Sequence, residues 1–134
     1  MVDLITCNPP WLPMSFLQPG GAGPGEILNG LDTDNAVYDP KERFLISCLN
    51  FAKFHLGESE EDTSPEMLLI YSDYAENLGV QAPNRIPTLA REFGFAQVDL
   101  LDQTSMPARK RNNKHDPLKL IKKQSHIQLW RIAR

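Results

Sequence analysis

Four consecutive residues near the start of the chain, Asn8-Pro9-Pro10-Trp11, combine a carboxamide, two rigid imino acids and a large aromatic ring. They follow a short apolar strand, expected over Leu4–Cys7. Neither proline can donate a backbone hydrogen bond, so the strand must stop at Cys7 and the four residues form a stiff corner. In open α/β sheets ligands bind outside the carboxyl ends of the strands. The sequence therefore predicts a rigid, ligand-facing corner with hydrogen-bonding and stacking groups.

A helix is expected to follow the loop after this corner. Asp39 is a good N-cap and Pro40 suits the first helical position. Apolar residues then recur at steps of three and four, which predicts one buried stripe, and Gly57 ends the helix. The stripe consists of Phe44, Leu45, Cys48, Leu49, Ala52 and Leu56.

The remaining elements alternate between strand and helix, which predicts a mostly parallel sheet with right-handed crossovers. The apolar strand Leu4–Cys7 suits a parallel sheet covered on both faces. No clear crossover helix precedes the last strand, after the basic connection Met106–Asp116, so we expect that strand to return antiparallel. The expected elements are strands over Met67–Tyr71, Phe95–Leu101 and Ile127–Ile132 and a helix over Arg85–Phe93.

The residues after the strand Met67–Tyr71 allow two interpretations. Asp73 and Glu76 have the spacing of a capping box, which predicts that a helical turn starts there. Asp73 also stands where a substrate pocket could be lined, but the capping pattern is the stronger of the two. Tyr74 could contact substrate or pack in the core, and the sequence does not separate these roles.

Composition limits the remaining possibilities. The length of 134 residues suits one domain. No apolar run approaches the roughly 20 residues that span a bilayer, and no signal-peptide pattern is present, so we expect a cytoplasmic protein without membrane contact. Cys7 and Cys48 are expected to be reduced, buried side chains and not a disulfide. The spacing of His55, His115 and His126 predicts no metal site.

Two further segments have a distinctive composition. Residues 12–25 are rich in glycine and proline and are expected to be a flexible loop; no strand precedes them and Pro24 lacks a donor, so they do not suit a phosphate-binding loop. Basic residues concentrate from Arg109 onward, where only Asp116 opposes them. Such a segment can contact nucleic-acid phosphates or form a solvated surface.

The corner, together with the segments Ala36–Asp39 and Ser72–Glu76 and the closing pair Leu129-Trp130, resembles class I S-adenosylmethionine-dependent methyltransferases that methylate planar amino nitrogens. The resemblance implies an α/β fold: the C-terminal half of a Rossmann-like sheet, mostly parallel with an antiparallel last strand. Residues 1–134 would form one partial domain, from its fourth to its seventh strand. The glycine-rich cofactor loop is expected upstream of Met1.

The resemblance assigns catalytic roles to Asn8, Pro9, Pro10 and Trp11. The cofactor would be S-adenosylmethionine, no metal would be needed, and the acceptor would belong to RNA, DNA or a protein glutamine. A non-catalytic interaction domain that keeps the fold is the alternative. If residues 1–134 form a partial methyltransferase domain, the uncharged strand Leu4–Cys7 would lack one of its two neighbouring strands. A homodimer that pairs through the exposed edge of this strand is therefore expected.

Overall fold

The structure is a computed structural model that describes residues 1–11, 39–106 and 119–134. The predicted glycine-rich loop at residues 12–25 and most of the late basic connection lie outside these residues. The described elements are β1 (Leu4–Cys7), a 3-10 turn (Pro40–Glu42), α2 (Arg43–His55), β2 (Glu66–Ser72), α3 (Tyr74–Asn77), α4 (Arg85–Glu92), β3 (Gln97–Ser105), α5 (Lys119–Gln124) and β4 (His126–Ala133).

The four strands form one sheet in the order β1-β2-β4-β3. β1 pairs with β2 in parallel, whereas β4 lies between β2 and β3 and is antiparallel to both. The chain therefore has an α/β fold, and the predicted antiparallel return of the last strand is confirmed. β1, β2 and β3 run in the same direction, as predicted for a mostly parallel sheet, and the insertion of the reversed β4 between β2 and β3 makes two of the three pairings antiparallel.

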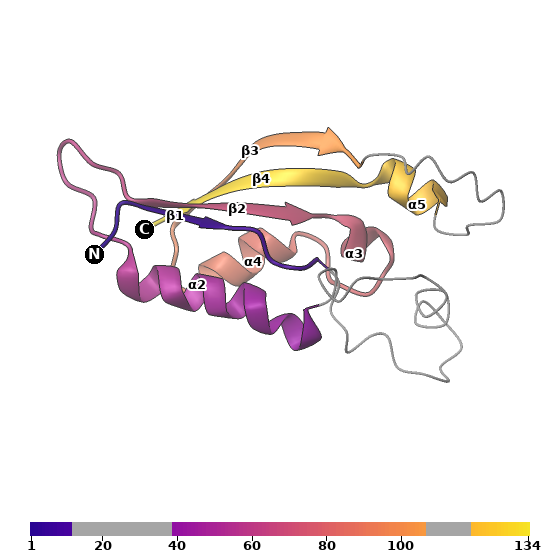
Figure 1. Cartoon of the computed structure of the whole chain (residues 1–134), viewed down its shortest axis with the longest axis horizontal. Helices are drawn as coiled ribbons and strands as arrows, with labels where there is room; N and C mark the ends of the chain where they lie inside the picture. Colours follow the sequence, from indigo (N-terminus) through magenta and orange to yellow (C-terminus); the bar gives the residue numbers. More distant parts are fainter. Residues whose placement is uncertain (12–38, 107–118) are drawn as a thin grey trace.

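The two faces of the sheet differ. α2 and α4 lie on the same face, as Figure 1 shows. In β2 the side chains of Met67, Leu69 and Tyr71 are buried toward these helices, while Ile70 on the opposite face is 38% exposed. Leu4 and Thr6 of β1 are exposed as well. Among the described residues, no helix covers this second face, so the expected burial on both faces is not found there.

The start of α2 depends on the carboxylate of Asp39, which is buried. Its two oxygens accept hydrogen bonds from the backbone N–H groups of Phe44 at 2.7 Å and Leu45 at 2.9 Å. Lys41 and Glu42 adopt left-handed backbone conformations, with φ of 54° and 56°, so the regular helix begins only at Arg43. The predicted capping role of Asp39 is confirmed, although the helix starts later than Pro40.

The buried stripe of α2 is narrower than the spacing predicted. Leu45, Leu49 and Ala52 are buried and Cys48 is half-buried, but Phe44 is 53% exposed. The irregular turn before Arg43 and the reach of the Asp39 carboxylate fix the rotation of the helix, and this rotation turns Phe44 outward. The inclusion of Phe44 in the core was therefore wrong.

A disulfide joins Cys7 to Cys48, with their Cα atoms 6.7 Å apart. The expectation of two reduced cysteines is wrong in this structure. The reason is that β1 and α2 pack face to face, which brings together two residues separated by 41 positions in the sequence. Their Cα separation lies within the range that disulfides span.

The later elements differ from expectation mainly at their ends. α4 closes before Gly94, whose φ of 92° suits glycine, as predicted. β3 continues to Ser105, beyond the expected Leu101, because its pairing with β4 extends to His126. The short helix α5 precedes β4, where the sequence indicated no clear helix.

We expect Asp39→Ala to lower the free energy of unfolding by about 2 kcal/mol, because two N–H groups at the start of α2, one of them buried, lose their acceptor. Asp39→Asn, which keeps one side-chain oxygen, should lie between Asp39→Ala and the unmodified protein. Urea unfolding followed by circular dichroism measures the change. The control is Asp62→Ala in an exposed turn, which should change stability by less than about 0.5 kcal/mol. Equal effects of Asp39→Ala and Asp62→Ala would contradict the capping role.

Candidate functional site

The corner Asn8–Trp11 begins where β1 stops pairing. The last paired residues are Cys7 in β1 and Leu69 in β2. The side chain of Pro9 is fully buried, whereas Asn8 is exposed. A buried proline directly after an exposed carboxamide anchors the backbone and displays the amide of Asn8 at the sheet edge.

Asn8 borders a hollow of about 270 Å³ on the sheet face that the helices leave uncovered. The side chain of Asn8 is exposed, and no hydrogen bond joins its amide to another described residue. Ligand sites commonly combine apolar walls with a few polar groups that fix orientation, and this hollow has that composition. Its walls are Thr6, Cys7, Asn8, Leu68, Ile70 and Leu129.

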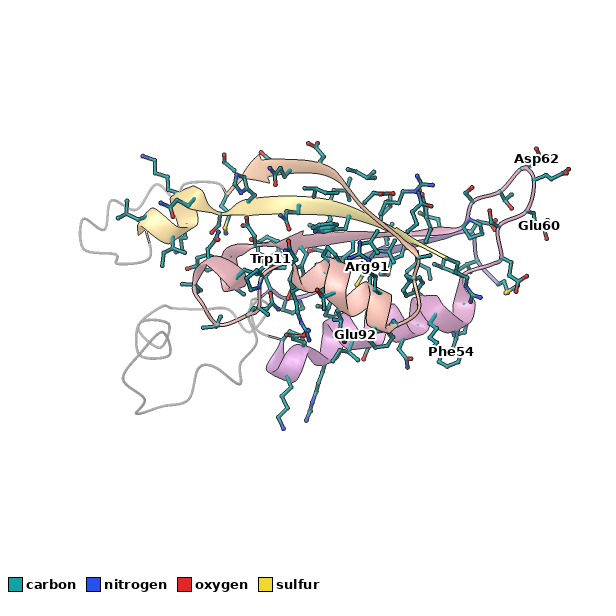
Figure 2. All side chains as sticks on the ribbon, turned by 180° about the vertical axis from the view of Figure 1, so that it is seen from behind. Trp11, Phe54, Glu60, Asp62, Arg91 and Glu92 are labelled. Atoms are coloured by element: carbon teal, nitrogen blue, oxygen red, sulfur yellow. A yellow bond between two sulfur atoms is a disulfide. The ribbon has the colours of Figure 1, made fainter. Side chains whose placement is uncertain are left out.

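Trp11 lies elsewhere. Its ring is half-buried and packs against the hydrophobic core, and it is not among the residues that border the Asn8 hollow (Figure 2). The indole Nε1 atom is buried, and it has no hydrogen-bond partner among the described residues. The structure thus indicates that Trp11 packs against the core and anchors the corner. Stacking of its ring on an acceptor group stays a prediction.

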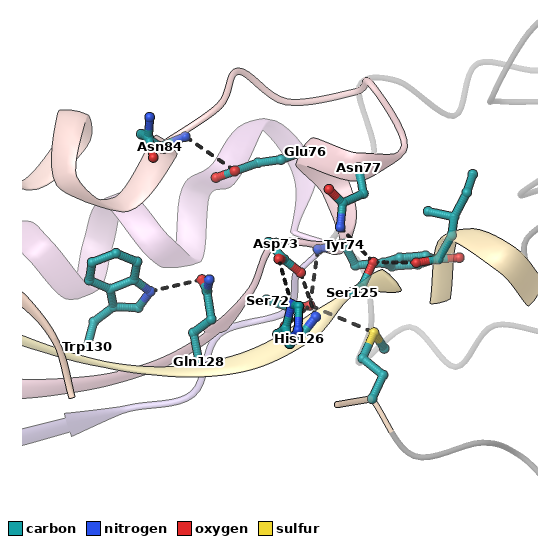
Figure 3. A network of polar contacts seen from close by, with 12 residues as sticks. Ser72, Asp73, Tyr74, Glu76, Asn77, Asn84, Ser125, His126, Gln128 and Trp130 are labelled. Carbon is teal, nitrogen blue, oxygen red and sulfur yellow. Dashed lines mark hydrogen bonds and ion pairs between the residues drawn. The ribbon is translucent and has the colours of Figure 1, made fainter. Parts of the chain in front are cut away.

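Asp73 binds the start of β4. Its carboxylate accepts a hydrogen bond from the backbone N–H of His126 at 2.6 Å and approaches the imidazole Nδ1 at 3.2 Å, as Figure 3 shows. No side-chain bond from Asp73 caps α3; the backbone N–H of Tyr74 is instead bound by the Ser72 hydroxyl at 3.1 Å. Asp73 directly precedes α3, so the helical turn predicted to start there is confirmed. The predicted side-chain capping bond is wrong, because β4, which is distant in sequence, supplies the partner of the Asp73 carboxylate.

Glu76, the other half of the expected capping box, also acts elsewhere. Its two carboxylate oxygens accept hydrogen bonds from the backbone N–H groups of Asn84 at 3.2 Å and Arg85 at 3.0 Å. Both donors lie at the start of α4. Glu76 consequently caps α4 and ties it to α3, and it makes no reciprocal pair with Asp73.

The structure separates Asp73 and Tyr74 from the Asn8 hollow. β2 continues three residues beyond the last pair with β1, from Ile70 to Ser72. At about 3.3 Å per residue, the end of β2 lies about 10 Å beyond the level of Cys7. Neither Asp73 nor Tyr74 borders the hollow, and the side chain of Tyr74 is buried, with 4% of its surface exposed.

A cluster of polar side chains that includes Glu42, Gln81 and Arg85 connects the start of α2 to the start of α4. Arg85 contacts Glu42 with Nε–Oε2 and Nη2–Oε2 distances of 3.0 and 2.7 Å. The amide of Gln81 donates to Glu42 and to the Tyr71 hydroxyl, each at 3.2 Å. Burial raises the pKa of Tyr71 to about 12, and the hydrogen bond with Glu42 raises the pKa of Arg85.

Sequence reasoning found the amide of the site but missed the walls of the hollow. Leu68 and Ile70 appeared only as part of a continuous apolar run, and Leu129 as part of an alternating strand. The signal that could have found them is the second apolar face of that run, since Leu68 and Ile70 alternate with the buried residues of β2. Leu68 and Ile70 come to the hollow through the pairing of β1 with β2, and Leu129 through the pairing of β4 beside β2.

Comparison with known proteins leaves the site to be interpreted from its own residues. No protein-family model, curated protein or solved structure matches the chain. Among the described residues, no three acidic, histidine or cysteine side chains come together to hold a metal ion. Within residues 1–11, 39–106 and 119–134, no helix is long and apolar enough to cross a membrane.

Because Trp11 packs against the core, Trp11→Ala should lower the free energy of unfolding by about 2 kcal/mol, somewhat less than for a fully buried aromatic residue. Trp11→Phe should cost less than half of that. The control is Phe54→Ala, at a side chain that is 67% exposed; its cost should stay within about 0.5 kcal/mol. Chemical denaturation of the three variants makes the comparison, and a Trp11→Ala protein as stable as the Phe54→Ala protein would rule out the anchoring role.

The raised pKa of Tyr71 predicts a loss of stability at alkaline pH. Tyr71 is neutral when protonated, and its pKa rises from about 10 in the unfolded chain to about 12 in the fold. The contribution of the protonated Tyr71 side chain to the free energy of unfolding is complete below pH 10. It is lost as the pH rises through 12, up to about 3 kcal/mol in total. In urea unfolding at several pH values from 8 to 12, the free energy of unfolding should fall less steeply with pH for Tyr71→Phe than for the unmodified chain. Identical slopes would show that Tyr71 does not titrate in this way.

Proposed function

We propose that this chain forms the acceptor-binding part of an S-adenosylmethionine-dependent methyltransferase that acts on a planar amino nitrogen. The observation that carries the proposal is the exposed carboxamide of Asn8 beside the hollow, held by the buried ring of Pro9 at the carboxyl end of β1. The antiparallel return of β4, which the resemblance implies for the last strand, supports it.

The difficulty of the proposed reaction lies in the acceptor. The lone pair of a planar amino nitrogen is delocalised into its neighbouring π system. In the proposal the Asn8 side-chain oxygen and the Pro9 backbone carbonyl accept hydrogen bonds from the two N–H groups. These bonds draw the nitrogen toward a tetrahedral geometry and stabilise the positive charge that develops on it. The two prolines keep the acceptors in place before substrate binds, which reduces the entropic cost of positioning.

The described residues do not suit the cofactor itself, which would supply the methyl group. β1 is followed by two prolines without N–H donors, not by a glycine turn that opens a helix and could hold an anionic group. No carboxylate that could bind ribose hydroxyls borders the Asn8 hollow. The cofactor-binding residues are therefore unknown, and the proposal assigns only the acceptor side to this chain.

The class of acceptor stays open between a nucleic-acid base and a protein glutamine. Two of the late basic residues already have partners within the fold. Arg131 forms an ion pair with Glu66 at 2.5 Å, and the guanidinium of Arg134 donates to the Lys53 carbonyl at 2.5 Å. The ion pair with Glu66 offsets the charge of Arg131, whereas the hydrogen bond to a neutral carbonyl leaves the charge of Arg134 in place.

The alternative, a non-catalytic interaction domain, has an observation of its own. α2 exposes three phenylalanines, Phe44, Phe51 and Phe54, whose side chains are 53%, 52% and 67% exposed. Exposed apolar patches on a protein surface often mark places where another protein binds. This alternative requires neither the cofactor nor an acceptor at Asn8.

Transfer of labelled methyl groups to RNA, DNA and protein tests the proposal, with protein expressed from its complete reading frame. Asn8→Ala should reduce turnover about a hundredfold, because one hydrogen bond to the developing charge is lost. Its affinity for S-adenosylmethionine, measured by calorimetry, should stay nearly the same. Asn50→Ala, at an exposed position of α2, is the matched control and should keep normal turnover.

Two results would count against the proposal. Near-normal turnover in the Asn8→Ala protein would remove the role given to this amide. A complete protein that neither binds S-adenosylmethionine nor transfers methyl groups would leave the interaction domain as the better description.

A further inference from the structure

The Cys7–Cys48 disulfide is attached directly to the candidate site. Cys7 is the last residue of β1 and immediately precedes Asn8, while Cys48 lies in the middle of α2. The bond therefore fixes the backbone one residue before the exposed carboxamide to the helix that covers the other face of the sheet. Any change in this bond acts at the base of the corner.

Few other contacts among the described residues hold the corner in place. Strand pairing of β1 ends at Cys7, and neither Pro9 nor Pro10 can donate a backbone hydrogen bond. What remains is the burial of the Pro9 ring and the packing of Trp11 against the core. The disulfide is the one covalent restraint beside these apolar contacts.

The two sulfur-bearing residues differ in access. Cys7 is buried, with 8% of its surface exposed, whereas Cys48 is half-buried. Exchange of a disulfide requires a thiolate to reach one of the two sulfur atoms. Because Cys48 is the more exposed residue of the pair, we assign the attack to its sulfur.

We propose that Cys7 and Cys48 form a reversible thiol–disulfide pair, operated by small-molecule thiols such as glutathione, that sets how firmly the Asn8–Trp11 corner is held. The proposal goes beyond the proposed function, since it concerns the position of the corner whatever ligand Asn8 binds. The composition predicts a reducing compartment, and the disulfides that occur in such compartments are usually transient, catalytic or redox-sensing.

Reduction proceeds in two exchange steps. A glutathione thiolate attacks Sγ of Cys48, the bond between the two protein sulfurs breaks, and the Cys7 sulfur leaves as a thiolate that takes up a proton. A second glutathione thiolate then attacks the glutathione sulfur of the mixed disulfide and releases Cys48, forming oxidised glutathione. Two electrons pass to the protein, and oxidation by oxidised glutathione reverses both steps.

The test equilibrates the protein in buffers of graded reduced-to-oxidised glutathione ratio. Alkylation of free thiols and mass spectrometry give the fraction that carries the disulfide. The position of the corner is followed in a Trp130→Phe background, in which Trp11 is the one remaining tryptophan. We expect the disulfide fraction to change from nearly none to nearly all across the series. The emission of Trp11 should change with the same midpoint.

The control is the double variant Cys7→Ala/Cys48→Ala in the same background. It should show no alkylation and the same Trp11 emission in every buffer, close to that of the reduced protein. Far-UV circular dichroism establishes that both proteins stay folded.

Four results would overturn the proposal. The disulfide could stay closed in every buffer, or fail to form in any. Trp11 emission could stay the same while the bond opens. The whole fold could be lost on reduction, which would make the bond a general structural restraint. None of these measurements depends on methyl transfer, so a failure here is distinct from a failure of the proposed function.

Discussion

The ladder between β2 and β4 is the constraint on which the rest of the described structure depends. Seven residue pairs join these strands, from Glu66 with Ala133 to Ser72 with Ile127. β1 is attached to the sheet through β2, and β3 is attached through β4. The β2–β4 ladder also builds the floor of the Asn8 hollow, since Ile70 and Leu129 are partners in it. A shift of β4 by one residue in this register would turn Leu129 away from the hollow while Ile70 stayed at it.

The two faces of the sheet have separate tasks. The face under α2 and α4 contains the core, including Met67 and Leu69, which are fully buried. The opposite face combines exposed aliphatic side chains with the ion pair between Arg131 and Glu66. The corner connects the two faces, because Pro9 and Trp11 contribute to the packed side while Asn8 stands at the hollow on the uncovered side.

Local patterns in the sequence predicted local structure well. The strand around Met67–Tyr71, the helix from Arg85 closed by Gly94 and the capping carboxylate of Asp39 were all recognisable, because each depends on neighbouring residues. The failures share a different cause. The side chain of Asp73 makes no capping bond to α3 because its partner His126 comes from a strand far along the chain. Cys48 pairs with Cys7 because β1 and α2 pack together.

The same distinction applies to the candidate site. The stiff corner and its carboxamide could be predicted, because they depend only on the four consecutive residues from Asn8 to Trp11. The walls of the hollow could not, because Leu129 joins the hollow only after β4 has inserted beside β2. Phe44 shows that even within one helix a periodic pattern leaves the rotation undetermined until the preceding turn is known.

The shortness of β1 limits what its outer edge can recognise. Only the four residues from Leu4 to Cys7 have strand geometry before two prolines remove the backbone donors. Four residues span about 13 Å, which allows an added strand only a few backbone hydrogen bonds. Backbone pairing over so short a length cannot by itself distinguish one alignment from the next. Any strand that joins this edge in a single alignment must take its selectivity from side chains, and Leu4 and Thr6, which are exposed on the uncovered face, are the residues of β1 that can provide it.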